Sequence, residues 1–438
     1  MKKQERLNMG AGKKISRRTV LAAGAATAGM GIVTALRRQI KQSVAFLDTH
    51  INPPAQAPES RADIFIARNG TPRQNMKRVM DMMGGIERYI RPNDIVVLKP
   101  NCQWWNQGRT NLEAMKAFIE LVLAIPGFSG EVIVAENNHF MDPEKPPQMQ
   151  LFTRGWIKYG EINNLIDGQK HTMLTMIESL RSEGHKNVSA VAWRDGGPKK
   201  DIWGNSQNGG VVESWQDGDG YVWTDEVFEF KGFMGLKTWK VKMSYPVFTS
   251  PYSNITIDFK NGAFERKSGR RITDRRVRFV NFAGLCDHGA DTGITSAVKN
   301  YMGITDLSCG YWGLEPQGYA NVHFVGESHY TYARAGVISH FMKTIRTADL
   351  NIVTAEWVGF GHRTDVARAT RARSIYAGTD PYALDYYGAK HLILPFSKNT
   401  ENHDPDDPAS AVGRFLRFGS EIIGHSVLDD RLITVHES

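Results

Sequence analysis

One short segment concentrates side chains that are able to bind an anion, transfer a proton or hold a metal ion. Asp287, His288 and Asp291 stand close together in it, and Lys299 follows. An imidazole with two carboxylates offers the nitrogen and oxygen ligands that divalent metals accept. A histidine is also suited to general acid–base catalysis. A metal site at Asp287, His288 and Asp291 is therefore one interpretation, and an ordinary hydrogen-bonded loop is the other.

Polar side chains also follow two predicted buried strands, at residues 94–98 and 131–135. A helix predicted between them, over 112–123, completes a strand-helix-strand unit, whose strands run parallel with a right-handed crossover. The carboxyl ends of parallel strands meet at one edge of the sheet, where open α/β folds bind ligands. The residues that we expect to lie together there are Lys99 and Asn101 after the first strand, and Glu136 and Asn137 after the second.

The sequence thus predicts one site at this edge of the sheet. Lys99 and Lys299 would hold an anionic group, a carboxylate or a phosphate, and a helix N-terminus would add to the attraction. These two lysines with Glu136 and His288 are the candidate catalytic residues, and Glu136 and His288 would act as acid or base. The residues predicted to bind or orient the ligand are Asn101, Asn137, Thr295, Asn300, Asp380 and Asp385.

The segment that carries Lys299 is predicted to form a strand, a loop and then a helix over 294–302. Apolar residues recur in this range at the spacing of one buried helical face. Gly303 stands where a helix-ending glycine would be. The opposite face, with Lys299 and Asn300, is either an ordinary solvated surface or part of a ligand site. The predicted proximity of Lys99 favours the ligand site.

Capping and turn signals predict further elements. Thr71 and Pro72 are expected to begin a helix as N-cap and first residue, and Thr110 with Glu113 to form a capping box. Asp380 also precedes a proline, so it is either a helix cap or a ligand group, with Asp385 one turn further on. Strands are predicted at 64–67, 255–259, 277–283, 350–354 and 374–377. A glycine-containing loop at 359–363 follows the fourth of these strands and carries His362 and Arg363.

These elements predict an α/β fold, with a mainly parallel sheet and helices on both of its faces. Residues 141–275 are rich in glycine and tryptophan and contain hairpin signals, so we expect a large β-containing insertion there. The expected parts of the chain are a signal or anchor over 1–45, a linker over 46–61, the α/β domain over 62–395 and a C-terminal extension over 396–438.

The formal net charge of +8 belongs to the N-terminus. The first 45 residues hold ten basic residues and one acidic residue, Glu5, so the other residues are almost neutral together. A basic face for nucleic acid is therefore not expected on the main domain, and nucleic acid is not among the predicted partners.

The three cysteines are Cys102, Cys286 and Cys309. None forms a C-x-x-C pair, so the sequence predicts no cysteine-ligated iron-sulfur cluster. One disulfide is open to them, but its pairing cannot be assigned from the sequence. Cys102 and Cys286 are either nucleophiles or, as is commoner, buried thiols.

Residues 16–21 read SRRTVL and precede a weakly apolar stretch rich in alanine and glycine. This pattern resembles the twin-arginine export signal. It predicts the twin-arginine translocation machinery as a partner and a location outside the cytoplasmic membrane. Cleavage after Ala35 or Ala45 and an uncleaved N-terminal membrane anchor are both open. Substrates of this route typically cross folded, which favours a bound cofactor without identifying one.

Four motifs together resemble the bacterial and archaeal family called the domain of unknown function 362. They are VLKPN at 97–101, TSAVKNYMG at 295–303, DLNIV at 349–353 and GTDPYALD at 378–385. The resemblance extends from about residue 62 to 395, apart from the longer segment 141–275, and it implies an α/β fold. Some members carry ferredoxin-like cysteine clusters, which this sequence lacks. The activity of the family is, as its name says, not established.

Two classes of function fit these observations. The first is an exported enzyme that binds a small anionic substrate or cofactor at the carboxyl edge of the sheet, with a divalent metal as a candidate cofactor. The second is a non-catalytic binding protein outside the membrane that captures the same ligand for a partner. A weaker variant is an accessory protein in electron transfer.

Overall fold

The computed structural model describes residues 60–137, 154–193, 211–231, 238–307, 319 and 330–438. The expected export signal, most of the linker and Cys309 lie outside these residues. Residues 60–438 form one compact unit. None of the helices in the described ranges is long and apolar enough to cross a membrane.

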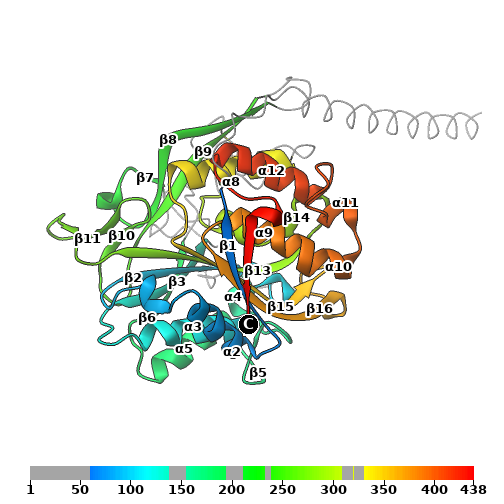
Figure 1. Cartoon of the computed structure of the whole chain (residues 1–438). Helices are drawn as coiled ribbons and strands as arrows, with labels where there is room; N and C mark the ends of the chain where they lie inside the picture. Colours follow the sequence, from blue (N-terminus) through cyan, green and yellow to red (C-terminus); the bar gives the residue numbers. More distant parts are fainter. Residues whose placement is uncertain (1–59, 138–153, 194–210, 232–237, 308–318, 320–329) are drawn as a thin grey trace, which may run out of the picture. The chain divides into compact units, whose positions relative to one another are not determined.

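A nine-stranded mixed sheet forms the centre of this unit (Figure 1). Its order is β17 (Ile433–Glu437), β1 (Ala62–Arg68), β16 (Ala369–Gly378), β15 (Leu350–Gly359), β13 (Val277–His288), β2 (Ile95–Pro100), β3 (Glu131–Asn137) and β6 (Val188–Trp193), and β14 (Gly293–Thr295) pairs with β13. β16 and the short β14 are antiparallel to their neighbours, and the other pairings are parallel. The predicted mainly parallel sheet is confirmed.

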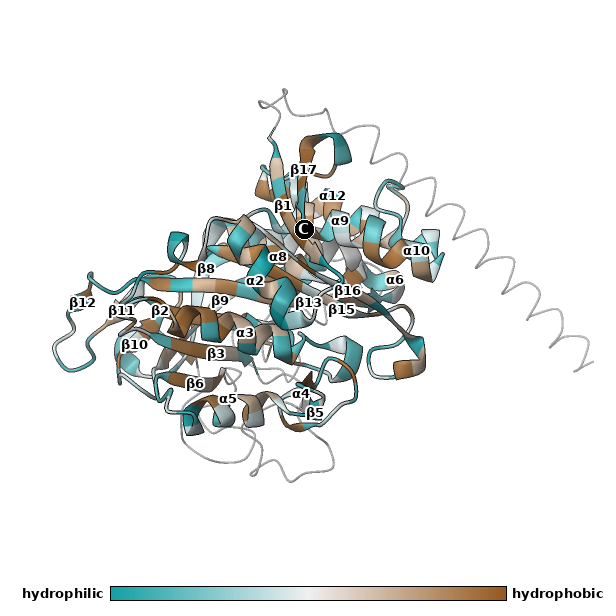
Figure 2. Ribbon diagram, turned by 60° about the horizontal axis from the view of Figure 1, so that its bottom comes forward, coloured by the Kyte–Doolittle hydropathy of each residue, from teal (hydrophilic) through white to brown (hydrophobic). Residues whose placement is uncertain are grey.

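Both faces of the sheet are covered, which follows from the alternation of its side chains. Ile95 and Val97 of β2 belong to one core cluster, and Val96 and Leu98 belong to the other. Three helices pack on the Val96 face: α2 (Pro72–Met82), α3 (Leu112–Leu123) and α5 (Met173–Ser182). Helices α8 (Tyr330–Thr344), α9 (Pro381–Gly388) and α12 (Ala411–Ile423) pack on the Ile95 face. Figure 2 shows the apolar character of β2, β3 and β6 between these layers.

A second, six-stranded sheet lies within the predicted insertion. Its order is β12 (Arg271–Ile272), β11 (Gly262–Phe264), β10 (Thr256–Asp258), β9 (Thr238–Thr249), β8 (Gly220–Lys231) and β7 (Val211–Val212). Only part of 141–275 belongs to it, because β6 from the same range joins the main sheet. The C-terminal segment is also part of the main α/β unit, since β17 pairs with β1 and α12 packs against α8.

Short elements complete the described chain. They are η1 (Ile86–Arg88), η2 (Asn106–Gly108), α4 (Arg154–Ile157), β4 (Leu165–Ile166), β5 (Gln169–Lys170), η4 (Trp215–Asp217), α6 (Gly289–Thr292), α7 (Ala297–Asn300), η6 (Tyr301–Gly303), η8 (Val366–Arg368), η9 (Ala389–Ile393), α10 (Leu394–Ser397), α11 (Thr400–His403) and η10 (Asp430–Leu432).

The predicted helix starts are right in two cases and wrong in one. Thr71 caps α2 with a capping box, and Asp380 caps α9. The N-cap of α3 is Asn111 instead of Thr110. The hydroxyl of Thr110 donates to the carbonyl of Phe282 on β13 at 2.7 Å. A contact with a distant strand thus replaces the local capping box.

The helix predicted over 294–302 is wrong in its first part. Strand β13 continues to His288, the chain reverses, and β14 pairs antiparallel with the end of β13, with Cys286 opposite Thr295. Gly293 has a φ of 71°, a left-handed conformation that glycine adopts without strain. The helical turn therefore starts at Ala297, and α7 and η6 carry the remaining residues of the predicted face.

Candidate functional site

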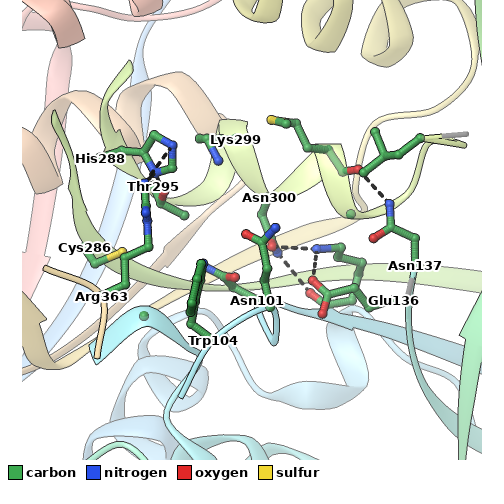
Figure 3. A pocket seen from close by; sticks show the side chains of 16 residues that line it. Asn101, Trp104, Glu136, Asn137, Cys286, His288, Thr295, Lys299, Asn300 and Arg363 are labelled. Carbon is green, nitrogen blue, oxygen red and sulfur yellow. Dashed lines mark hydrogen bonds and ion pairs between the residues drawn. The ribbon is translucent and has the colours of Figure 1, made fainter. Parts of the chain in front are cut away.

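A pocket opens at the carboxyl ends of the parallel strands (Figure 3). It holds about 570 Å³ of space, including its open mouth. The described residues that line it are Lys99, Asn101, Gln103, Trp104, Gly108, Glu136, Asn137, Cys286, His288, Thr295, Lys299, Asn300, Met302, Gly303, Leu307 and Arg363. The four candidate catalytic residues are in this set, with four of the six candidate ligand-binding residues. The pocket divides into two ends with different chemistry.

At one end, Lys99 is fully engaged with the protein. Its side chain is 1% exposed, and its Nζ donates to Glu136 Oε1 at 2.7 Å, Asn300 Oδ1 at 2.7 Å and the carbonyl of Pro100 at 2.8 Å. Three acceptors require three N–H groups, and only the ammonium form of lysine has three. In this structure all three N–H groups of Lys99 are thus used within the protein, and its role in holding an anion stays a prediction.

Glu136 is equally occupied. Its Oε2 accepts from the backbone N–H of Cys102 at 3.0 Å, and Trp156 also bonds its side chain. Burial raises the pKa of Glu136 and lowers the pKa of Lys99, while their mutual attraction opposes both shifts. Because Lys99 uses three N–H groups, we assign the charged pair. Glu136 is thus the counter-ion of Lys99 and not a free acid or base.

Gly303 makes room for this pair. A Cβ atom on it would lie 2.2 Å from Nζ of Lys99 and 2.9 Å from Oε1 of Glu136. Gly303 ends η6 and does not have a positive φ, so it is not the left-handed helix cap that the sequence suggested. Its role is the close approach of the chain to the buried ion pair.

A chain of amides fixes the Lys99 end. Asn300 donates to the carbonyl of Lys99 at 3.1 Å and to Asn281 Oδ1 at 2.7 Å, and Asn281 donates to Asn351 Oδ1 at 2.9 Å. The sheet register places Asn281 opposite both Lys99 and Asn351. Asn137 donates to the carbonyls of Met302 and Thr305, both at 3.0 Å. These amides hold α7 and η6 on the sheet, and their hydrogen bonds are within the protein.

Lys299 occupies the other end. It lies on α7 and is 7% exposed, yet no hydrogen bond or ion pair joins its Nζ to another described residue. Burial lowers its pKa to about 7, and the nearby cations Arg334 and Arg363 lower it further. Asp291, which acts in the opposite direction, is bonded to Arg334 at 3.1 Å. Lys299 is thus a buried amine that is largely neutral above pH 7.

Arg363 reaches the same end from the loop after β15. Asn106 and Gln107 of η2 position this loop: Asn106 donates to the carbonyl of Thr364 at 2.9 Å, and Gln107 to that of Asp365 at 2.6 Å. The guanidinium lies 5.8 Å from the ring centre of Trp104, a cation–π contact. Arg363 follows a predicted strand as Lys99 does, and this position is the signal by which it could have been found.

His288 and Thr295 connect to Arg363. The Nη2 of Arg363 is 3.1 Å from Nδ1 of His288, and Oγ1 of Thr295 is 2.9 Å from the same nitrogen. The same Nη2 lies 3.3 Å from Nε2, and because a guanidinium can only donate, a ring nitrogen of His288 is the acceptor in this contact. Cys286 lines the wall beside them, and burial raises the pKa of its thiol to about 11.

The two remaining candidate ligand groups lie outside the pocket lining. Asp385 accepts from the N–H groups of Ala297 at 2.7 Å and Val298 at 2.9 Å. Burial raises its pKa to about 7. Its carboxylate occupies the start of α7, so this helix end offers no anion site. Asp380 caps α9 and also accepts from the N–H of Val427 at 2.8 Å.

The three candidate metal ligands have separate partners. Asp287 Oδ1 is 2.5 Å from Nε2 of His403, Asp291 pairs with Arg334, and His288 contacts Arg363. In the described residues, no group of three or more histidine, cysteine or acidic side chains is arranged to hold a metal ion. The hydrogen-bonded loop is the interpretation that matches these contacts.

Comparisons of the chain with family models, with curated proteins and with solved structures find no match. The site is therefore interpreted from its own geometry.

Proposed function

We propose that this protein is an enzyme that binds a small organic anion in the pocket and exchanges a proton with it through Lys299. The observation that carries this proposal is the state of Lys299: a buried amine that faces a pocket and has no bonded partner among the described residues. An unpaired buried polar group is costly in a folded protein. Such a group is commonly retained because it serves a function.

Electrostatics favours an anion as the ligand. Arg363 and Arg334 approach Lys299, and the carboxylate near them, Asp291, is already bonded to Arg334. A carboxylate or phosphate would supply the counter-charge that this end needs, and Arg363 is suited to bind it through two N–H groups. The side-chain amide of Asn101 also lines the pocket and has no recorded bond to a described residue, so it would orient the ligand.

The proton affinity of Lys299 suits catalysis. A general acid or base works best when its pKa is close to the working pH. The pKa of Lys299, about 7, meets this condition. His288 lines the same pocket and would relay protons. Lys99 and Glu136 would maintain the frame of the pocket.

Calorimetric titration with phosphate and with glyoxylate, an anionic aldehyde, tests the binding step. We expect one of these anions to bind the wild type and to bind at least tenfold more weakly to Lys299→Met and to Arg363→Gln. The exposed Lys186, changed to methionine, is the matched control and should leave binding unchanged. If the two pocket variants bind as tightly as Lys186→Met, the proposal is wrong.

We also propose that the protein is exported by the twin-arginine route, on the motif at 16–21. Replacing Arg17 and Arg18 together by lysine should retain the protein in the cytoplasm of its host, as cell fractionation would show. Unchanged export of this variant would contradict the proposal.

A further inference from the structure

We infer that Lys299 is a nucleophile that forms an imine with its substrate, and that the substrate is a small aldehyde or ketone bearing a carboxylate or phosphate group. This inference rests on the proposed anion site and adds the substrate class and the covalent step. It rests on the position of the Lys299 amine, which lines the pocket with Arg363 and has no bonded partner among the residues that the structure describes.

Lys99 and Lys299 differ in the partners that the protein provides for them. This fold keeps a buried lysine charged by giving it a carboxylate and two further acceptors. Lys299 receives none of these from the described residues, although it is almost as buried. If its task were only to supply positive charge, a carboxylate-supported lysine or another guanidinium would perform it better, because an arginine stays charged when buried. A buried lysine without a carboxylate partner instead favours its neutral form, which is a free amine.

A neutral amine at this position is also reactive towards carbonyl compounds. Only a neutral amine attacks a carbonyl carbon, and desolvation or a neighbouring cation is a known means of producing one in a protein. Both act on Lys299, where burial and the two guanidiniums lower the pKa to about 7. The other nucleophile of this wall, Cys286, is shifted in the opposite direction, since burial raises its pKa to about 11. At neutral pH the amine is thus the more available nucleophile.

The step balances without a further reactant. The lone pair of Nζ attacks the carbonyl carbon, and a proton transfer from nitrogen to oxygen gives a carbinolamine. The oxygen then takes a second proton, which comes from solvent, the C–O bond breaks as water leaves, and a protonated C=N bond remains. Arg363 would hold the anionic group beside the reacting carbon, and His288, which lines the same pocket, is the group placed to exchange the protons.

The test uses glyoxylate with sodium borohydride, which reduces an imine to a stable secondary amine. The full-length protein is treated at pH 7 with limiting glyoxylate and analysed by peptide mass mapping. We expect a carboxymethyl group on Lys299 at a level roughly tenfold or more above exposed lysines such as Lys186, because those lysines are almost fully protonated at this pH. An adduct spread evenly over the exposed lysines, or none on Lys299, would overturn the inference.

The variant Lys299→Arg separates this inference from the proposed function. It keeps a cation at the site but cannot form an imine. We expect this variant to bind glyoxylate but to lack the dominant adduct. The control variant Lys186→Arg should keep both the binding and the adduct on Lys299. If the wild type binds glyoxylate but gives no adduct on Lys299, the imine is wrong and the anion site stands. If neither phosphate nor glyoxylate binds the wild type, the anion site is wrong. If Lys299→Arg does not fold, peptide mass mapping of the wild type alone still shows whether Lys299 forms the imine.

Discussion

Two lysines line the same pocket and are both buried, but their surroundings within hydrogen-bond reach differ. Lys99 is bonded to a carboxylate, an amide and a backbone carbonyl, which fixes it in the ammonium form. Lys299 has two cations nearby and no bonded acceptor among the described residues. Burial alone therefore does not decide the role of a lysine. The partners within hydrogen-bond reach decide it, so one lysine is structural and the other is chemically available.

The largest effect should come from replacing each lysine by methionine. Lys99→Met leaves the Glu136 carboxylate buried without its cation, and we expect a loss of about 3–5 kcal/mol in the free energy of unfolding. Lys299→Met leaves no such charge behind and removes an amine whose burial disfavours its charged form, so it should not lower stability at neutral pH. Urea unfolding followed by circular dichroism measures both.

The double variant Lys99→Met with Glu136→Met is the control for that comparison. It removes both charges, so it should recover most of the stability that Lys99→Met loses. Equal losses for the two single lysine variants would show that the two ends of the pocket do not differ as described.

The second prediction is the pH dependence of stability. The pKa of Lys299 is lowered to about 7 in the folded state, against about 10.4 for a lysine in an unfolded chain. Between these values the unfolded state binds more protons, so the stability contributed through Lys299 rises with pH. Relative to Lys299→Met, the wild type should gain up to roughly 1.4 kcal/mol per pH unit in this window. Urea unfolding at a series of pH values measures the difference. A pH-independent difference would mean that the amine titrates normally.

The third prediction concerns Gly303, which makes room for the Lys99 pair. Gly303→Ala places a methyl group against Nζ of Lys99 and should cost about 1–3 kcal/mol by overpacking. Gly361→Ala is the matched control, since its Cβ would meet nothing closer than 3.5 Å and its φ is not positive. Thermal unfolding of both variants would show the contrast. A Gly303→Ala protein as stable as the control would disprove the tight approach.

The smallest effect is expected at Asn101, whose side chain lines the pocket without a recorded bond to a described residue. Asn101→Ala should leave stability unchanged and weaken anion binding by about 1 kcal/mol, roughly fivefold, the usual size of one hydrogen bond. Asn300→Ala is the counterpart and should lower stability, because Asn300 bonds Lys99 and Asn281. Calorimetry and urea unfolding of the two variants would separate the roles, and the reverse pattern would contradict them.

The location of the pocket could be predicted from the sequence because it depends on strand order. Lys99 and Glu136 follow two strands of one strand-helix-strand unit, and parallel strands bring their carboxyl ends to one edge. Arg363 also follows a strand of this sheet. That strand was predicted over 350–354, and it extends to Gly359 in the structure. The longer strand brings Arg363 close to the strand end, which the predicted bounds did not show.

The role of each residue could not be predicted, because it depends on contacts between distant segments. The hydrogen bond from Lys99 Nζ to Asn300 Oδ1 joins residues 201 positions apart, and it engages a candidate anion-binding lysine within the protein. Asp385 was expected to bind a ligand, but it accepts from the start of α7 instead. Nothing in the local pattern around Asp385 identifies this partner.

The most direct test of the account is competitive labelling of the native protein with acetic anhydride across a range of pH, read by peptide mass mapping. Acetylation of Lys299 should rise with a midpoint near pH 7, while exposed lysines follow an ordinary pKa of about 10.4. Lys99 should stay unlabelled until the protein unfolds, because its three N–H groups are bonded. A Lys299 that titrates with the exposed lysines, or a Lys99 that is labelled in the folded protein, would contradict it.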